Sequence, residues 1–268
     1  MERTRASPLA RRARCAVPVL LLCSGAYAQP STVGKWSEVL EWPDNGTHLM
    51  LLPTGKVLSW DESDPEAMNL WDPATGEHSV ASHPGYNTFC AGHALLADGR
   101  LLVSGGHIDT NRGLKYASIY DPITDSWTRL PDMNAGRWYP TNTALPNGDM
   151  LVIAGTQTAR RLGENRLPQV WQTKSHRWRD LTSAQLTLQQ YPWMFVAPNG
   201  RVFNAGPDPV ARYLDTSGTG RWTDVAGSLH GDRFAGSAVM YDDGRIMVCG
   251  GGEKFPTESV EVIDLNDP

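Results

Sequence analysis

The sequence predicts an all-β protein that folds as a β-propeller of about five four-stranded blades. Five segments share one pattern: an apolar strand, a turn with Asn, Asp or Thr before glycine, a second apolar strand and a stop at small residues. They are HLMLLPTGKVLSW, HALLADGRLLVSGG, NTALPNGDMLVIAG, MFVAPNGRVFNAG and SAVMYDDGRIMVCGG. Each is typical of a β-hairpin. The turn glycines recur at blade-length intervals of 44, 49, 52 and 44 residues, at Gly55, Gly99, Gly148, Gly200 and Gly244.

The second half of each unit predicts the third and fourth strands of a blade. A tryptophan opens the fourth strand in three units, at Trp127, Trp178 and Trp222, and His78 takes this position in the first unit. We interpret these tryptophans as contacts between blades. The last unit lacks such a strand. Trp36 lies 42 residues before His78, which is the position of a fourth-strand tryptophan one repeat earlier. The strand beginning at Trp36 can therefore complete the last blade and close a ring of five, which would leave no bare sheet edge.

This organisation resembles the kelch repeat over residues 36–268, which implies a kelch-type β-propeller. The same units are equally compatible with the front part of a seven-bladed propeller. A β-sandwich also contains several hairpins, but it gives no reason for glycine, aromatic residue and tryptophan to return in the same order five times. We therefore favour the propeller.

The first 28 residues indicate an export signal. Five arginines precede a short apolar run, Cys15–Cys23, and the sequence Ala-Tyr-Ala stands just before Gln29. A basic start, a short apolar core and a small-residue cleavage site are typical of a secretory signal peptide. We therefore expect a signal peptide over 1–28, a propeller over 29–268, and a secreted or periplasmic protein. The apolar run is too short to span a membrane.

The remaining composition excludes several classes of function. Removing residues 1–28 changes the net charge from −5 to −9, which argues against nucleic acids and anionic membranes as partners. The motifs HExxH, GxSxG, GxGxxG and the P-loop are absent, and the seven histidines show no metal-type spacing. The exported chain keeps two cysteines. Of these, Cys249 lies in the apolar strand IMVCGG and is expected in the core.

Superposing the repeats on their turn glycines brings reactive side chains together. The residue nine positions before the glycine is Cys90 in the second unit, Tyr139 in the third, Tyr191 in the fourth and Ala235 in the fifth. In a propeller, equal offsets place residues on neighbouring blades at the same height, facing the central channel. Cys90 and Tyr139 are therefore expected to share one space, where a thiol and a phenol can form a metal site or a covalent crosslink. The simpler interpretation is a buried thiol beside a channel-lining phenol.

The segments around this pair resemble the galactose oxidase and glyoxal oxidase group of copper radical oxidases. They are NTFCAGHALLADGRLLVSGG and DSWTRLPDMNAGRWYPTNTALPNG, and the run RWYP is closer to the glyoxal oxidase branch. The resemblance implies that Tyr139 binds copper and carries a radical, and that Cys90 is joined to it by a thioether. It also implies that copper is the cofactor and that a small primary alcohol, aldehyde or carbohydrate is the substrate. We expect a monomer.

The chain departs from the family pattern in two ways. The family completes its copper site with a Tyr-His pair at the start of a later blade and with a further histidine, and the 268 residues contain neither. The tryptophan that stacks over the crosslinked pair in galactose oxidase falls at Gln157. The expected activity is therefore oxidation of an alcohol or aldehyde by O2, giving H2O2, if the missing ligands are supplied. The alternative is a non-catalytic kelch propeller that binds glycan or protein through its loops.

The export signal leads to a direct prediction. When the chain is expressed in a secreting host, we expect cleavage after Ala28, because Ala26 and Ala28 fit the small-residue cleavage site. N-terminal sequencing of the exported protein should then begin at Gln29. A mature protein that still carries Arg11 and Arg12 would contradict the assignment.

Overall fold

The computed structural model describes residues 34–64, 66–158, 163–252 and 254–266. The chain divides into two compact units, Met1–Glu41 and Trp42–Pro268. Residues 34–41 contain no helix or strand, and all the strands lie in the second unit. The predicted signal peptide at 1–28 lies outside the described residues. Within the described ranges, no helix is long and apolar enough to cross a membrane.

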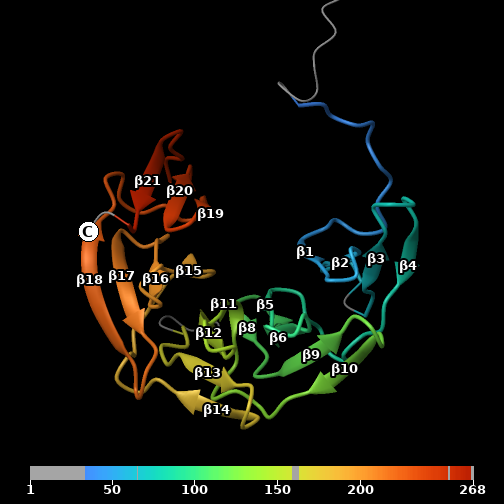
Figure 1. Ribbon diagram of the computed structural model, residues 1–268, viewed down its shortest axis with the longest axis horizontal. Helices are drawn as coiled ribbons and strands as arrows, with labels where there is room; N and C mark the ends of the chain where they lie inside the picture. Colours follow the sequence, from blue (N-terminus) through green and yellow to red (C-terminus); the bar gives the residue numbers. More distant parts are fainter. Residues whose placement is uncertain (1–33, 65, 159–162, 253, 267–268) are drawn as a thin grey trace, which may run out of the picture. The chain divides into compact units, whose positions relative to one another are not determined.

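Five β-sheets follow one another along the second unit, each built from one consecutive stretch of chain (Figure 1). The first contains β1 (His48–Leu51), β2 (Val57–Trp60), β3 (Asn69–Trp71) and β4 (His78–Val80). The second contains β5 (Ala91–Leu95), β6 (Leu101–Gly105), β9 (Ala117–Asp121) and β10 (Ser126–Arg129), with a two-stranded ribbon of β7 (His107–Asp109) and β8 (Arg112–Gly113) inserted between β6 and β9.

The third sheet contains β11 (Trp138–Ala144), β12 (Met150–Thr156), β13 (Gln169–Gln172) and β14 (Arg177–Asp180). The fourth contains β15 (Met194–Val196), β16 (Val202–Asn204), β17 (Val210–Asp215) and β18 (Arg221–Gly227). The fifth contains β19 (Ser237–Asp242), β20 (Arg245–Cys249) and β21 (Val260–Asp264). All neighbouring strands pair antiparallel.

The predicted kelch-type propeller is confirmed. Each expected hairpin forms the first two strands of one sheet, and a sandwich of two large sheets is excluded because the strands pair only within their own repeat. The turn glycines have φ of 68–86°, a region that favours glycine and lets the chain reverse tightly: Gly55, Gly99, Gly148, Gly200 and Gly244.

Consecutive sheets are held together by four buried apolar clusters, each of which joins two neighbouring sheets. The fourth-strand tryptophans add a repeated hydrogen bond. The indole Nε1 donates at 2.8–2.9 Å to a carbonyl in the segment that leaves the preceding sheet, from Trp127 to Ser82, from Trp178 to Pro131 and from Trp222 to Ala184. The predicted role of these tryptophans as contacts between blades is confirmed.

The predicted closure by a strand at Trp36 is not observed. The fifth sheet has three strands among the described residues, and residues 34–41 form no strand. The Trp36 side chain is 97% exposed. A strand is stabilised by its ladder hydrogen bonds and by the surface it covers. A tryptophan at the matching position of the repeat is therefore not enough to make a segment a strand.

The expected core position of Cys249 is also corrected. Side chains alternate between the two faces of a strand, and on β20 the buried ones are Ile246 and Val248. Cys249 therefore faces the other side and is half-buried. The continuous apolar run in this strand conceals the alternation.

Candidate functional site

One backbone conformation recurs at the start of the first strand of every sheet. The residue nine positions before each turn glycine has a positive φ, between 47° and 64°, at Gly46, Cys90, Tyr139, Tyr191 and Ala235. Four of these five residues carry a side chain, although L-residues adopt this region only rarely. The matching offset in the sequence therefore corresponds to a shared bend of the backbone.

Backbone hydrogen bonds connect these bends from one sheet to the next. The amide of Tyr139 donates to the carbonyl of Cys90, and the amide of Tyr191 donates to the carbonyl of Tyr139, both at 2.9 Å. The amide of Cys90 donates in turn to Nε2 of His48 in the first sheet, at 3.0 Å. Cys90 and Tyr139 therefore lie on adjacent sheets at the same height, as their equal offsets predict.

Cys90, Tyr139 and Tyr191 line one cavity of about 330 Å³, together with His48 and His93. Burial raises the pKa of the Cys90 thiol to about 12, an effect partly offset by hydrogen bonding from the Tyr139 hydroxyl. Burial, and next the contact with Cys90, raise the pKa of Tyr139 well above its usual value. The thiol and the phenol therefore line one cavity and are both uncharged at neutral pH.

The Tyr139 ring lies between two other aromatic rings. The Trp138 indole stacks on it with centroids 3.8 Å apart and planes 10° apart, and the Tyr191 ring stacks on it at 4.6 Å and 20°. Nε1 of Trp138 donates to Nδ1 of His107 at 3.0 Å, which fixes the indole. Gln157 is exposed. The stacking partners of the phenol are therefore Trp138 and Tyr191, and the sequence identified Tyr191 only through its offset.

Arg137 holds the strand that carries Tyr139. Its side chain is fully buried and donates to the carbonyls of Ala154 and Leu167 at 2.6 and 2.7 Å. Burial lowers its pKa to about 9. Gly113 and Gly155 lie so close to Arg137 that a Cβ at either would collide with it. The sequence analysis did not predict a role for Arg137. A signal was present, because an arginine also stands two positions before the left-handed residue of the fifth sheet. This residue is Arg233, whose side chain donates to the carbonyl of Gly250.

The described residues do not form a complete copper site. Among them, no group of three or more His, Cys, Asp and Glu side chains is placed to hold a metal ion. Burial, and next the proximity of His93, lower the pKa of His48 to about 3, and burial lowers the pKa of His93 to about 4. Nε2 of His48 already accepts the Cys90 amide. The cavity is also lined by the phenols of Tyr139 and Tyr191 and by the Cys90 thiol, but three or more metal-binding His, Cys, Asp or Glu side chains do not converge there among the described residues.

The raised pKa of Cys90 predicts low reactivity in the folded chain. Cys90 is fully buried and Cys249 is half-buried, so we expect iodoacetamide at pH 8 to label Cys249 at least about tenfold faster. Because the thiolate fraction rises about tenfold per pH unit below the pKa, labelling of Cys90 should still be increasing at pH 10. Peptide mass mapping separates the two sites, and unfolding in urea is the control that should equalise them. Equal rates in the folded chain would contradict this environment for Cys90.

Comparisons with known proteins find relatives of this chain. The family model for the glyoxal oxidase N-terminus matches residues 78–208. A galactose oxidase of Gibberella zeae is 27% identical over 91% of this chain and 40% of its own length. An aldehyde oxidase GLOX of Vitis pseudoreticulata is 28% identical over 62% of this chain and 34% of its own length. The chain thus spans well under half the length of these curated relatives.

A solved structure is also similar to this chain. A fungal alcohol oxidase of the AA5 family, in complex with copper, matches with a TM-score of 0.72 and 27% identity, covering 86% of this chain and 55% of that one. The match to the glyoxal oxidase N-terminus includes both Cys90 and Tyr139. In its repeats, its sheet order and these relatives, the chain is similar to the galactose oxidase and glyoxal oxidase-like family of kelch-repeat proteins.

Proposed function

We propose that this chain carries the cysteine–tyrosine half of a copper radical oxidase site, in a protein exported by cleavage after Ala28. Tyr139 is the copper ligand and the radical-bearing residue, and Cys90 is its covalent modifier. The observation that carries this proposal is that Cys90 and Tyr139 occupy the same left-handed position on adjacent sheets and share one cavity. The copper-bound relative and the oxidase relatives support it.

The proposed reaction is the oxidation of a primary alcohol or an aldehyde by O2. An alcohol gives up two electrons and two protons to become an aldehyde, and O2 takes them up as H2O2. The chain's own residues position the phenol. Trp138 and Tyr191 confine its ring, the bend at Tyr139 directs it into the cavity, and Arg137 anchors the strand.

The covalent modification also balances with O2 as the oxidant. A bond forms between Sγ of Cys90 and a ring carbon of Tyr139 next to the hydroxyl. The S–H and C–H bonds break, and the two protons and two electrons reduce O2 to H2O2. The backbone hydrogen bond between Tyr139 and Cys90 and the cavity that both side chains line support the proximity that this bond requires.

Crosslinking tests the proposal. Because the described residues place no group of three or more His, Cys, Asp and Glu side chains to hold a metal ion, we expect the purified 268-residue chain to keep its Cys90 and Tyr139 peptides separate after exposure to copper and air. If the gene encodes a Tyr-His pair beyond codon 268, a chain that includes it should join the two peptides with loss of two hydrogens. Tyr139→Phe is the matched control, since it removes only the hydroxyl.

The outcomes separate the candidate functions. An efficient crosslink in the 268-residue chain would show that the donor set has been underestimated. If the ligand-complete chain formed no crosslink, retained no copper and released no peroxide with simple alcohols and aldehydes, the oxidase proposal would fail. A kelch propeller that binds glycan or protein through its loops would then be favoured.

A further inference from the structure

Three asparagines of this chain are followed by glycine, and all three are exposed. They are Asn45, Asn147 and Asn199. Such a pair is chemically labile, because the amide nitrogen of the glycine can attack the side-chain carbonyl of the asparagine and glycine has no Cβ to hinder the attack. Exposure to solvent therefore does not distinguish the three pairs, and we compared their hydrogen bonds.

The pair at Asn147 is fixed within the hairpin turn that joins β11 to β12. Oδ1 of Asn147 accepts the amide of Asp149 at 3.1 Å. The amide of Gly148 donates to the carbonyl of Leu145 at 2.9 Å, which closes the turn. Both the attacking nitrogen and the side chain that it would attack are therefore engaged in hydrogen bonds.

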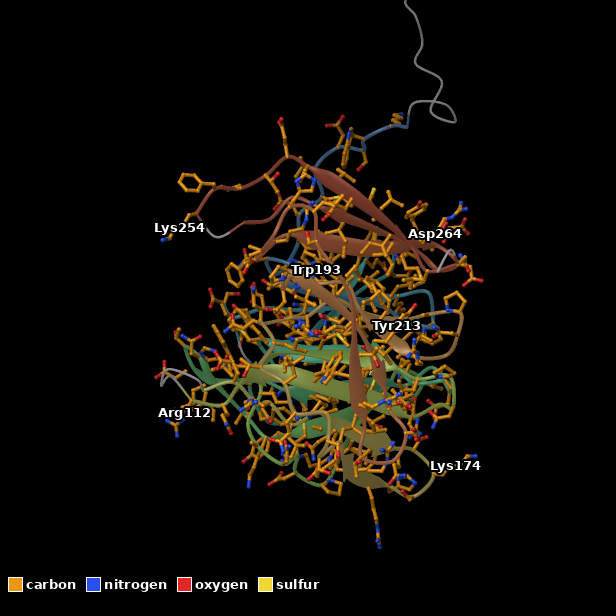
Figure 2. The ribbon with its side chains drawn as sticks, turned by 90° about the vertical axis from the view of Figure 1, so that its left-hand side faces the viewer. Arg112, Lys174, Trp193, Tyr213, Lys254 and Asp264 are labelled. Atoms are coloured by element: carbon orange, nitrogen blue, oxygen red, sulfur yellow. The ribbon has the colours of Figure 1, made fainter. Side chains whose placement is uncertain are left out.

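The pair at Asn199 is fixed in the same way. It joins β15 to β16, in the sheet that also carries Tyr213, which is labelled in Figure 2. Oδ1 of Asn199 accepts the amide of Arg201 at 3.0 Å, and the amide of Gly200 donates to the carbonyl of Ala197 at 2.8 Å. The repeated hairpin turn thus protects both of these asparagines.

Asn45 lies in the loop before β1 and differs in both respects. Within the described ranges its side chain forms no hydrogen bond, while its backbone amide donates to Oδ2 of Asp61 at 2.7 Å. The amide of Gly46 donates to Oδ1 of Asp44 at 2.7 Å, and Oδ2 of that carboxylate accepts the Ser59 hydroxyl at 2.7 Å. The side chain under attack is therefore free, and the proton of the attacking nitrogen already lies on a fixed base.

We propose that Asn45 is a site of spontaneous deamidation, in which Asp44 takes the amide proton of Gly46. A bond forms between the Gly46 nitrogen and Cγ of Asn45, the proton passes through the carboxylate to the leaving nitrogen, and ammonia departs from a five-membered succinimide ring. Water then opens the ring to give aspartate or isoaspartate. The step needs no metal or oxidant and is independent of the proposed function.

The product alters the connection between the first sheet and the candidate site. Isoaspartate adds one methylene group to the main chain directly before Gly46, which occupies the same left-handed position as Cys90 and Tyr139. Two residues later, Nε2 of His48 accepts the Cys90 amide. Deamidation therefore changes the backbone at the bend from which this hydrogen bond is made.

Peptide mass mapping of the full chain during incubation at pH 8 measures the three sites side by side. A hairpin pair must first break hydrogen bonds, each of which slows it by about two- to tenfold, so we expect Asn45 to deamidate at least about fivefold faster than Asn147 or Asn199. Unfolding in urea is the control, since it removes these contacts and should make the three rates similar. Asn45→Gln is the matched variant, and it should abolish the mass change because glutamine would have to close a larger ring.

The variant Asp44→Ala tests the proton acceptor. It should slow deamidation of Asn45 by at least about threefold in the folded chain and leave the rate in urea unchanged. If Asp44→Ala loses the folded circular dichroism spectrum, the pH dependence of the unaltered chain replaces it. Hydroxide rises about tenfold per pH unit and a carboxylate base does not, so from pH 6 to pH 8 the Asn45 rate should rise less steeply in the folded chain than in urea.

Equal rates at the three sites of the folded chain, or a faster rate at either hairpin turn, would overturn the proposal. An unchanged Asn45 rate in folded Asp44→Ala, or a pH response as steep as that in urea, would overturn the role of Asp44.

Discussion

The site depends on a left-handed bend that recurs at the start of each sheet. A bend of this kind costs free energy for any residue with a Cβ, and the repeat places four such residues there. The hydrogen bonds from Tyr139 to Cys90 and from Tyr191 to Tyr139 offset part of that cost, since each bend satisfies the backbone of its neighbour. The same bonds set the spacing of the side chains. The thiol and the phenol line one cavity because the backbone of one sheet is hydrogen-bonded to that of the next.

The rest of the fold supports this arrangement. The tryptophans of the fourth strands and the four apolar clusters fix the sheets against one another. The buried Arg137 ties the strand of Tyr139 to its own sheet through backbone carbonyls and without a carboxylate partner, while Arg233 pairs with Glu261 at 2.8 Å. The glycines around Arg137 leave the space that its backbone and Cβ need. Residues that do not line the cavity therefore add to the rigidity that Trp138 and Tyr191 give the phenol.

The sequence predicts what depends on local pattern. The hairpins, the turn glycines and the shared position of Cys90 and Tyr139 follow from spacing within one repeat, and the structure confirms their geometry. Predictions that depend on partners distant in the chain were wrong, and some residues that depend on such partners were not predicted. Trp36 forms no strand, Cys249 lies on the outer face of its strand, and the roles of Trp138 and Arg137 become visible only once neighbouring sheets are in place.

The central claim is that the repeat itself places the Cys90 sulfur against the Tyr139 ring before any metal is bound. A crystal structure of the metal-free chain tests it most directly. The account predicts positive φ at both residues and a Cys90 Sγ within about 4 Å of a Tyr139 ring atom. A sulfur turned away from the ring, or a negative φ at either residue, would contradict it.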